Sequence, residues 1–178
     1  MSIREPFDRP WWRWPGRYRH SRGFGIHSPL TFRIITEIIN SGGTGYYTET
    51  TATLPAGMSR EDYRRIVALI CLLRPGSVTT GHKVLDQAIT TDIDSAIKTD
   101  TTEPDMIVVC DSRLPHPAII GACLERGGTM IITDSRNLRD QISKILHGMG
   151  HGISLSGKRM VIAIGRRDIS RQHFELNF

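Results

Sequence analysis

Two apolar runs rich in β-branched residues, in the second half of the chain, have the pattern of buried strands. They run from Met106 to Cys110 and from Thr129 to Thr133, and an aspartate follows each run. A segment of helical length joins them and ends at Gly127-Gly128. Continuous apolar runs are typical of strands that are covered on both faces. The pattern therefore predicts a β-α-β unit at the centre of a mostly parallel sheet, with helices on both faces.

The residues that follow these two runs are the first candidates for a functional site. Ligands of open α/β sheets bind outside the carboxyl ends of the strands, where we expect Asp111 and Asp134. Carboxylate oxygens are ligands that suit Mg²⁺ or Ca²⁺. An aspartate after a strand is also a common helix N-cap, and Asp134 before Ser135 fits that role. We prefer the capping interpretation to a metal site.

Three segments have helical periodicity and clear boundaries. The first begins at Ser28-Pro29, with serine suited to the N-cap and proline to the first turn. The second begins with a sequence that resembles a capping box, Ser59 to Asp62, and ends at Arg74-Pro75-Gly76. The third is capped by Asp134 or Ser135 and ends within Gly148 to Gly152.

The segment between the second helix and the central unit has weaker signals. Ser77 to Thr80 predicts a short strand, and the apolar positions of Lys83 to Ile89 predict two helical turns. The stretch from Thr90 to Glu103 is rich in Thr and Asp. In that stretch we place at most one short strand, near Thr91 to Ile93.

The C-terminal part predicts antiparallel pairing. Ile153 to Ser156 and Met160 to Gly165 form a hairpin around Gly157-Lys158, and Phe174 to Phe178 is one more short edge strand. The sequence as a whole predicts a Rossmann-like α/β fold that closes with an antiparallel hairpin.

Composition limits the class of protein. A chain of 178 residues is one ordinary domain with room for a sizeable core. Its three cysteines lie in apolar runs without the spacing of metal ligands, so we expect small buried side chains in a reducing compartment. No apolar run approaches the roughly 20 residues of a membrane span, and the N-terminus lacks the apolar region of a signal peptide. These features favour a cytoplasmic protein.

The net charge of +5 is concentrated near the N-terminus. Residues 1–22 predict an irregular arm, and residues 23–178 a single domain. Arginine interleaved with Trp11, Trp12 and Trp14 is suited to a nucleic acid or another anionic surface. The alternative, which we prefer, is that the tryptophans pack on their own domain and the arginines stay in solvent. The candidate anion-binding residues are Arg13, Arg17, Arg19 and Arg22.

The order of the motifs resembles a known family. An α/β sheet that begins with helices and closes with a hairpin resembles class I S-adenosylmethionine-dependent methyltransferases. Gly25 to Pro29, GIHSP, is similar to the N-terminal signature of a group related to small-molecule O-methyltransferases. Met160 to Arg166 and Gln172-His173-Phe174 resemble the last strand and terminal segment of that group. Asp105 to Asp111 and Gly128 to Asp134 resemble its two strands that end in an acid. The resemblance implies S-adenosylmethionine as cofactor and a small-molecule substrate.

The sequence departs from that family at the cofactor site. The family's first strand leads into a turn of the type acidic-x-Gly-x-x-x-Gly, because the backbone passes close to the cofactor. Here that place holds a single glycine, Gly81, with no acid before it. Only 23 residues lie between Gly81 and Asp105, whereas a β-α-β unit takes about 30. We therefore expect a shortened cofactor half, in which Asp92 or Asp94 could replace the acid that holds the ribose.

Two histidines are further candidates. His27 could act as a base, although holding the loop by hydrogen bonding is the preferred role at a helix start. His116, between two prolines, resembles the histidine at the end of the family's corresponding strand. His147 and His151 have the spacing of a metal pair, but the glycines around them favour an exposed turn. No hydrolase, nucleotide-triphosphatase or zinc motif is present.

Three functions remain open from the sequence. The leading one is a degenerate methyltransferase-like domain, non-catalytic or regulatory. The second is an active O-methyltransferase of unknown substrate. The third is an anion-binding or nucleic-acid-binding module that uses the N-terminal arm. In the second function, the residues around the cofactor are Gly81, Asp92 or Asp94, Asp111 and Asp134.

Overall fold

The computed structural model describes residues 28–46, 52–93, 97–99, 101–111, 113–133 and 135–178, without the side chains of residues 136 and 137. The predicted arm (residues 1–22), His27, Asp94 and Asp134 lie outside these residues. Within the described part, no helix has the length and apolar composition that a membrane crossing needs.

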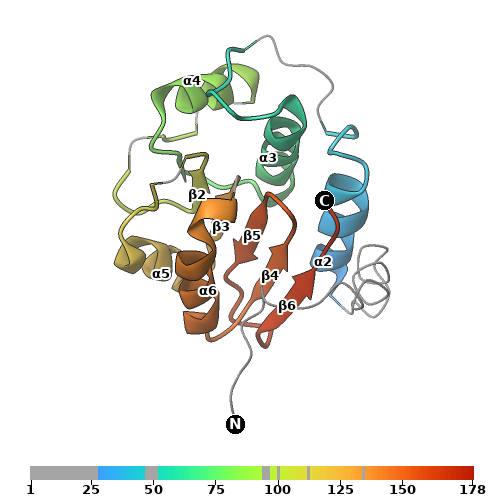
Figure 1. Cartoon of the computed structure of the whole chain (residues 1–178), viewed down its shortest axis with the longest axis vertical. Helices are drawn as coiled ribbons and strands as arrows, with labels where there is room; N and C mark the ends of the chain where they lie inside the picture. The colour runs from blue at the N-terminus through green and yellow to red at the C-terminus, as the bar shows by residue number, and fades with distance from the viewer. Residues whose placement is uncertain (1–27, 47–51, 94–96, 100, 112, 134) are drawn as a thin grey trace.

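The described strands form one six-stranded sheet in the order β1-β2-β3-β5-β4-β6 (Figure 1). The pairs β1/β2, β2/β3 and β4/β6 are parallel, and β3/β5 and β4/β5 are antiparallel. The predicted Rossmann-like, mostly parallel sheet with a C-terminal hairpin is therefore confirmed. The strands are β1 Val78–Thr79, β2 Met106–Val109, β3 Thr129–Ile132, β4 Ile153–Ser156, β5 Val161–Ile164 and β6 Gln172–Glu175.

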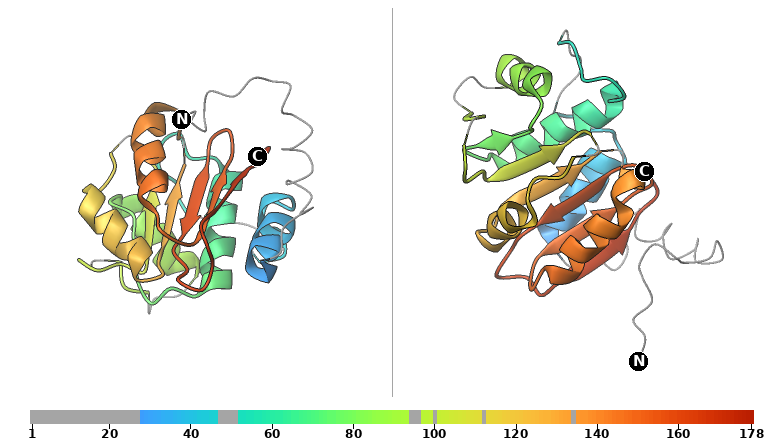
Figure 2. Two further views of the ribbon diagram at one scale, coloured as in Figure 1. Left: turned by 90° about the horizontal axis from the view of Figure 1, so that it is seen from below. Right: turned by 60° about the vertical axis from the view of Figure 1, so that its left-hand side comes forward.

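Helices cover both faces of the sheet (Figures 1 and 2). One face carries α2, the π-helix η2 that continues it, α3 and α4, and the other carries α5 and α6. Each helix therefore has one face of the sheet to bury its apolar side chains against. The helices are α2 Pro29–Arg33, η2 Ile34–Ile39, α3 Arg60–Leu73, α4 Lys83–Asp92, α5 Pro117–Glu125 and α6 Arg139–Gly148, with a 3₁₀ turn, η3, at Ser135–Leu138.

The central strands alternate between the two layers of the core. Met106 and Val108 face the α3 side, whereas Ile107 and Val109 face the α5 side, and all four are buried. Ile131 of β3 pairs with Ile162 of β5, and both are fully buried. Ile107 and Val109 of β2 and Ile131 of β3 are buried, so the predicted burial of the two central apolar strands is confirmed.

Two predicted helix starts have the expected caps. The Ser28 hydroxyl accepts the Thr31 N–H at 3.3 Å, and the Ser59 hydroxyl accepts the Asp62 N–H at 3.0 Å. The second helix ends, as predicted, where Arg74 takes a left-handed conformation with φ of 50°. These caps satisfy N–H groups that have no partner within the helix.

The predicted strand near Thr91 to Ile93 is wrong, because α4 continues to Asp92 instead of ending at Ile89. The Ile93 N–H still donates to the Ile89 carbonyl at 3.0 Å, and the Thr90 hydroxyl bonds back to the Asp86 carbonyl at 3.1 Å. The helical pattern of hydrogen bonds therefore outweighs the low helix propensity of the threonines.

The start of the last helix also differs from the prediction. Helix α6 begins at Arg139, after the 3₁₀ turn, and its N-cap position is Leu138 without a side-chain cap. Ser135 is buried, and its N–H donates to the Arg159 carbonyl at 2.8 Å. Ser135 therefore joins the turn to the C-terminal hairpin and does not cap α6.

The terminal edge strand is present but shifted toward the N-terminus. It spans Gln172–Glu175 instead of Phe174 to Phe178, and it pairs with β4 in parallel. The connection from β5 passes the start of β4, where the Gly152 N–H donates to the Ile169 carbonyl at 2.9 Å. A Cβ on Gly152 would lie 2.2 Å from the Ile164 carbonyl oxygen, so only glycine fits this crossing.

Candidate functional site

The turn after β1 is where the family resemblance places the cofactor. The Thr80 hydroxyl accepts the His82 N–H at 3.0 Å and lies 2.7 Å from the Asp86 carboxylate, to which it can donate. Thr80 is buried. The polar groups of the turn are therefore bonded to one another, within residues 80–86. Helix α4 begins directly after the turn.

Gly81 lies at the tip of this turn with φ of +66°. This left-handed conformation favours glycine. A Cβ there would meet no atom within 4 Å, so there is open space above the turn. Beside it, His82 Nδ1 is buried and has no hydrogen-bond partner among the described residues. This corner could therefore accept a ligand atom without a rearrangement of the backbone.

A second segment lies along the outer side of β1. Ser77 forms a parallel bridge with Lys98, and the Val78 N–H donates to the Lys98 carbonyl at 2.8 Å. Strand β1 thus has β2 on one side and this bridge on the other, which is the arrangement of a topological switch point. Among the described residues the neighbour on this side is a single bridge and not a strand.

The predicted acids that the structure describes lie at different distances from the turn after β1. Asp111 follows β2, the neighbour of β1, so it lies at the same edge of the sheet as Gly81. It is exposed, and its Oδ1 accepts the Arg113 N–H at 2.9 Å. Asp92 is the last residue of α4, which begins next to Gly81 and is about 15 Å long. Its carboxylate accepts the Tyr63 hydroxyl at 2.9 Å.

The predicted histidines have structural contacts. His116 is the N-cap of α5, and its Nδ1 accepts the Ala118 N–H at 3.3 Å. His147 lies in the last turn of α6, whereas His151 forms a bridge with Ser170 beyond the helix. Among the described residues, no three His, Cys, Asp or Glu side chains gather as ligands for a metal ion.

The cysteines are unpaired and at least half-buried. Burial raises the pKa of Cys123 to about 11 and raises the pKa of Cys71 and Cys110. A reactive cysteine needs a lowered pKa, because the thiolate is the nucleophile. None of the three therefore has the environment of a catalytic thiol.

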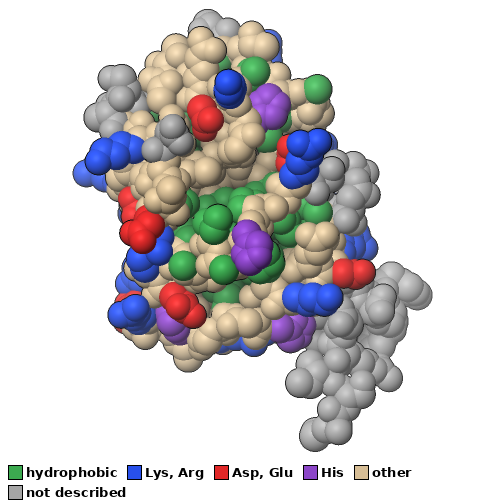
Figure 3. All heavy atoms as spheres, turned by 90° about the vertical axis from the view of Figure 1, so that its left-hand side faces the viewer, with side chains coloured by type: hydrophobic (Ala, Val, Ile, Leu, Met, Phe, Trp, Pro, Cys, Tyr) green, Lys and Arg blue, Asp and Glu red, His purple; other side chains and the backbone are tan. Residues whose placement is uncertain are grey.

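Sequence reasoning missed a groove between α5 and α6, on the face of the sheet away from α3. Its volume is about 760 Å³. Apolar side chains gather in a hollow on this face (Figure 3). The signal in the sequence is the run from Pro117 to Leu124, which has no polar side chain and so no face made for solvent. The apolar lining is Leu114, Pro117, Leu124, Ile145 and Met149.

A smaller hollow of about 230 Å³ lies at the amino edge of the sheet, where the parallel strands β2 and β3 begin. It is lined by the starts of β2 and β3, including Met106 and Thr129, and by Leu30 of α2. Ligands of open α/β sheets bind at the carboxyl edge, so this hollow at the amino edge is a weak candidate for the predicted cofactor.

Comparison with protein-family models finds no family that matches the sequence, and comparison with curated proteins finds no match. The resemblance to methyltransferases therefore stays a prediction.

Proposed function

We propose that the chain is a methyltransferase-like domain with a shortened cofactor half, and that it acts as a non-catalytic or regulatory domain. One observation carries the proposal. The outer side of β1, where ribose and adenine would lie in the related enzymes, has a single bridge at Lys98 among the described residues. The wall for the nucleoside is therefore reduced at the position where the sequence lacks a β-α unit.

The contacts of the remaining candidates support the same proposal. Thr80 closes the turn after β1 through its bonds to His82 and Asp86. Asp92 is bonded to Tyr63 at the far end of α4, so it lies away from Gly81. A ribose requires a carboxylate beside the glycine turn. Of the predicted acids that the structure describes, Asp111 lies at that edge, whereas the Asp86 carboxylate beside the turn is bonded to Thr80.

A second candidate function, an active O-methyltransferase that binds S-adenosylmethionine, is favoured by the corner around Gly81. The open space at Gly81 is a feature that a bound cofactor could use, whereas contact with the buried Nδ1 of His82 would require a rotation of that side chain. In that function a methyl group would pass from the sulfonium of the cofactor to a substrate oxygen.

Titration with S-adenosylmethionine and S-adenosylhomocysteine separates the two functions. We expect a dissociation constant above about 1 mM. A value of about 1 mM corresponds to a binding free energy of about −4 kcal/mol. Isothermal titration calorimetry measures it directly. A dissociation constant near about 10 µM, lost in Gly81→Val, would contradict our proposal and support the active enzyme. Gly57→Val is the matched control, because Gly57 also has a positive φ and open space around its Cβ position.

A further inference from the structure

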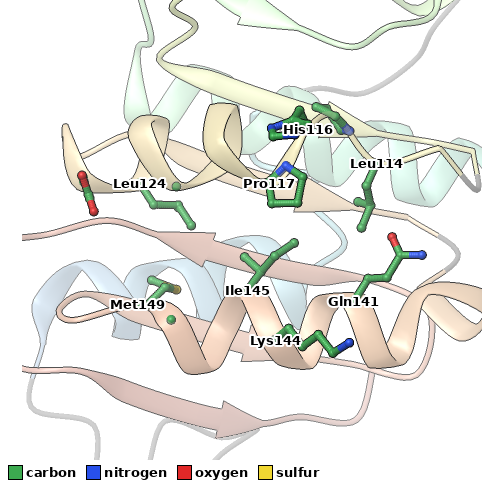
Figure 4. A pocket seen from close by; sticks show the side chains of 12 residues that line it. Leu114, His116, Pro117, Leu124, Gln141, Lys144, Ile145 and Met149 are labelled. Atoms are coloured by element: carbon green, nitrogen blue, oxygen red, sulfur yellow. The ribbon is translucent and has the colours of Figure 1, made fainter.

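The groove between α5 and α6 has different side chains at its two ends. Leu114 and Gln141 lie at one end, and Leu124 and Met149 lie at the other (Figure 4). Ile145 lies between these ends in the same view. Helices α5 and α6 follow the parallel strands β2 and β3, so their starts lie toward the carboxyl edge and their ends toward the amino edge.

Three hydrogen-bond donors line the groove, one at the start of α5 and two in the first six residues of α6. They are the His116 ring and the side chains of Gln141 and Lys144. His116 Nδ1 accepts the Ala118 N–H, which leaves Nε2 as the protonated nitrogen of the neutral ring. Gln141 and Lys144 are three residues apart on α6, so they lie on the same side of the helix.

None of these three donors is used elsewhere in the described part of the chain. Gln141 and Lys144 are exposed, and their side chains make no hydrogen bond or ion pair to another described residue. In Figure 4 the ammonium group of Lys144 extends toward the Gln141 end of the groove. The acid of the lining, Glu125, belongs to the last turn of α5, at the opposite end.

From this charge pattern we infer that the groove binds a small amphiphilic carboxylate, with its apolar body between α5 and α6. The carboxylate accepts hydrogen bonds from His116, Gln141 and Lys144, and the apolar body contacts Ile145 and Met149. A volume of about 760 Å³ lies within the usual range of small-molecule sites, which are mostly apolar with few polar groups. Among the described residues of the lining, Lys144 is the single formal cation, so one negative charge matches it better than two. This site lies apart from the turn after β1, and it does not depend on the proposed function.

Calorimetry of the full chain with hexanoate, octanoate and decanoate tests the apolar body. We expect one site per chain and an affinity that rises about fourfold for each added CH₂ group, because each buried CH₂ contributes about 0.8 kcal/mol. An affinity that does not change with chain length would overturn the inference. Decyltrimethylammonium has the same apolar body with the opposite charge, and we expect it to bind more weakly than decanoate.

Exchange of the charge at Lys144 tests the polar end. Lys144→Met should weaken decanoate about fivefold, which is the upper range for an exposed ion pair. Lys144→Glu should reverse the preference, so that decyltrimethylammonium binds more tightly than decanoate. Lys158→Met is the matched control, since Lys158 is exposed on the hairpin turn away from the groove. Equal decanoate binding by the parent chain and Lys144→Glu would overturn the inference.

Filling the groove tests its location. Gly121 lines the groove, and a Cβ there would meet no atom within 4 Å. Gly121→Leu should therefore fold, with a better helix former in α5, and lose decanoate binding. Circular dichroism and the denaturant midpoint verify folding. Unchanged decanoate binding would overturn the inference. So would a dimer of the parent chain that Gly121→Leu dissociates in sedimentation experiments, because the groove would then be an interface between copies.

Discussion

The Tyr63 hydroxyl donates a 2.9 Å hydrogen bond to the carboxylate of Asp92, and so joins the first turn of α3 to the end of α4. Tyr63 is fully buried, whereas Asp92 is half-buried. Sequence reasoning considered Asp92 as a ribose ligand, and the structure places it in a contact between two helices.

Removal of this hydroxyl should destabilise the fold. We expect Tyr63→Phe to lower the free energy of unfolding by about 1.5 to 3 kcal/mol, since a hydrogen bond to a charged group is lost in a buried place. Denaturant unfolding measures the change. Tyr46→Phe is the control, because the Tyr46 hydroxyl contacts an exposed carboxylate, that of Glu37. An equal loss in both variants would mean that burial does not strengthen the Tyr63 contact.

Ile131 should be a central residue of the core. Ile131→Ala should cost about 2 to 5 kcal/mol, through lost apolar burial and the cavity that remains. Ile119, which is 43% exposed on α5, gives the comparison, and Ile119→Ala should change stability by about 0.5 kcal/mol or less. If Ile131→Ala unfolds at the same denaturant midpoint as the parent chain, the assignment of β3 to the middle of the sheet is wrong.

Gly165 should tolerate no side chain. Its Cβ would lie 1.7 Å from the Leu124 carbonyl oxygen, a backbone atom that cannot move without a shift of α5. Gly165→Ala should therefore cost about 1 to 3 kcal/mol or more. At Gly45 an added Cβ meets no atom within 4 Å. In thermal unfolding, the melting temperature should fall strongly for Gly165→Ala and change little for Gly45→Ala.

The Cys123 thiol gives a prediction of pH dependence. Its pKa of about 11 in the folded chain is above the ordinary value of 9.0, because burial disfavours the thiolate. Between these two pH values the unfolded chain loses a proton that the folded chain keeps, so the free energy of unfolding falls as the pH rises. The parent chain should lose more stability from about pH 9 to pH 11 than Cys123→Ala, which has no thiol to titrate. Equal losses would contradict this role of Cys123.

The predicted N-terminal arm lies outside the described residues, so its interpretation remains open to experiment. We expect that deletion of residues 1–22 lowers stability and that the full chain does not bind oligonucleotides at about 50 mM salt. Fluorescence anisotropy checks the second point. Binding that falls with salt at a log-log slope near about −3 would instead assign phosphate contacts to Arg13, Arg17, Arg19 and Arg22.

The sequence predicts those parts of the fold where local and tertiary preferences agree. The run Met106 to Cys110 is apolar throughout, so it predicts a strand that is buried on both faces. Ser59 is the N-cap of α3 and marks where that helix begins. The end of α4 was predicted incorrectly because its threonines indicate a strand. In the structure, helical hydrogen bonds continue to Ile93, and the Tyr63–Asp92 contact holds the last turn in place.

The site was less predictable than the fold, because it depends on spacing between elements that are distant in the sequence. His116 was selected for its place after a strand, and its position at the groove became visible only with α6 beside α5. Lys144 and Gln141 are ordinary polar residues of an exposed helix surface. Only the apolar α5 sequence could have indicated a groove at this place.

The parallel strand β6 covers the outer side of β4. Its pairing with β4 occupies the hydrogen-bonding groups on one side of Ile153–Ser156, a strand that is buried throughout. A chain in which β6 detaches would present β4 as an open apolar edge, which is a template for pairing with a second molecule. Substitutions that weaken the register of His173 and Phe174 should therefore appear first as aggregation, before any loss of the central sheet.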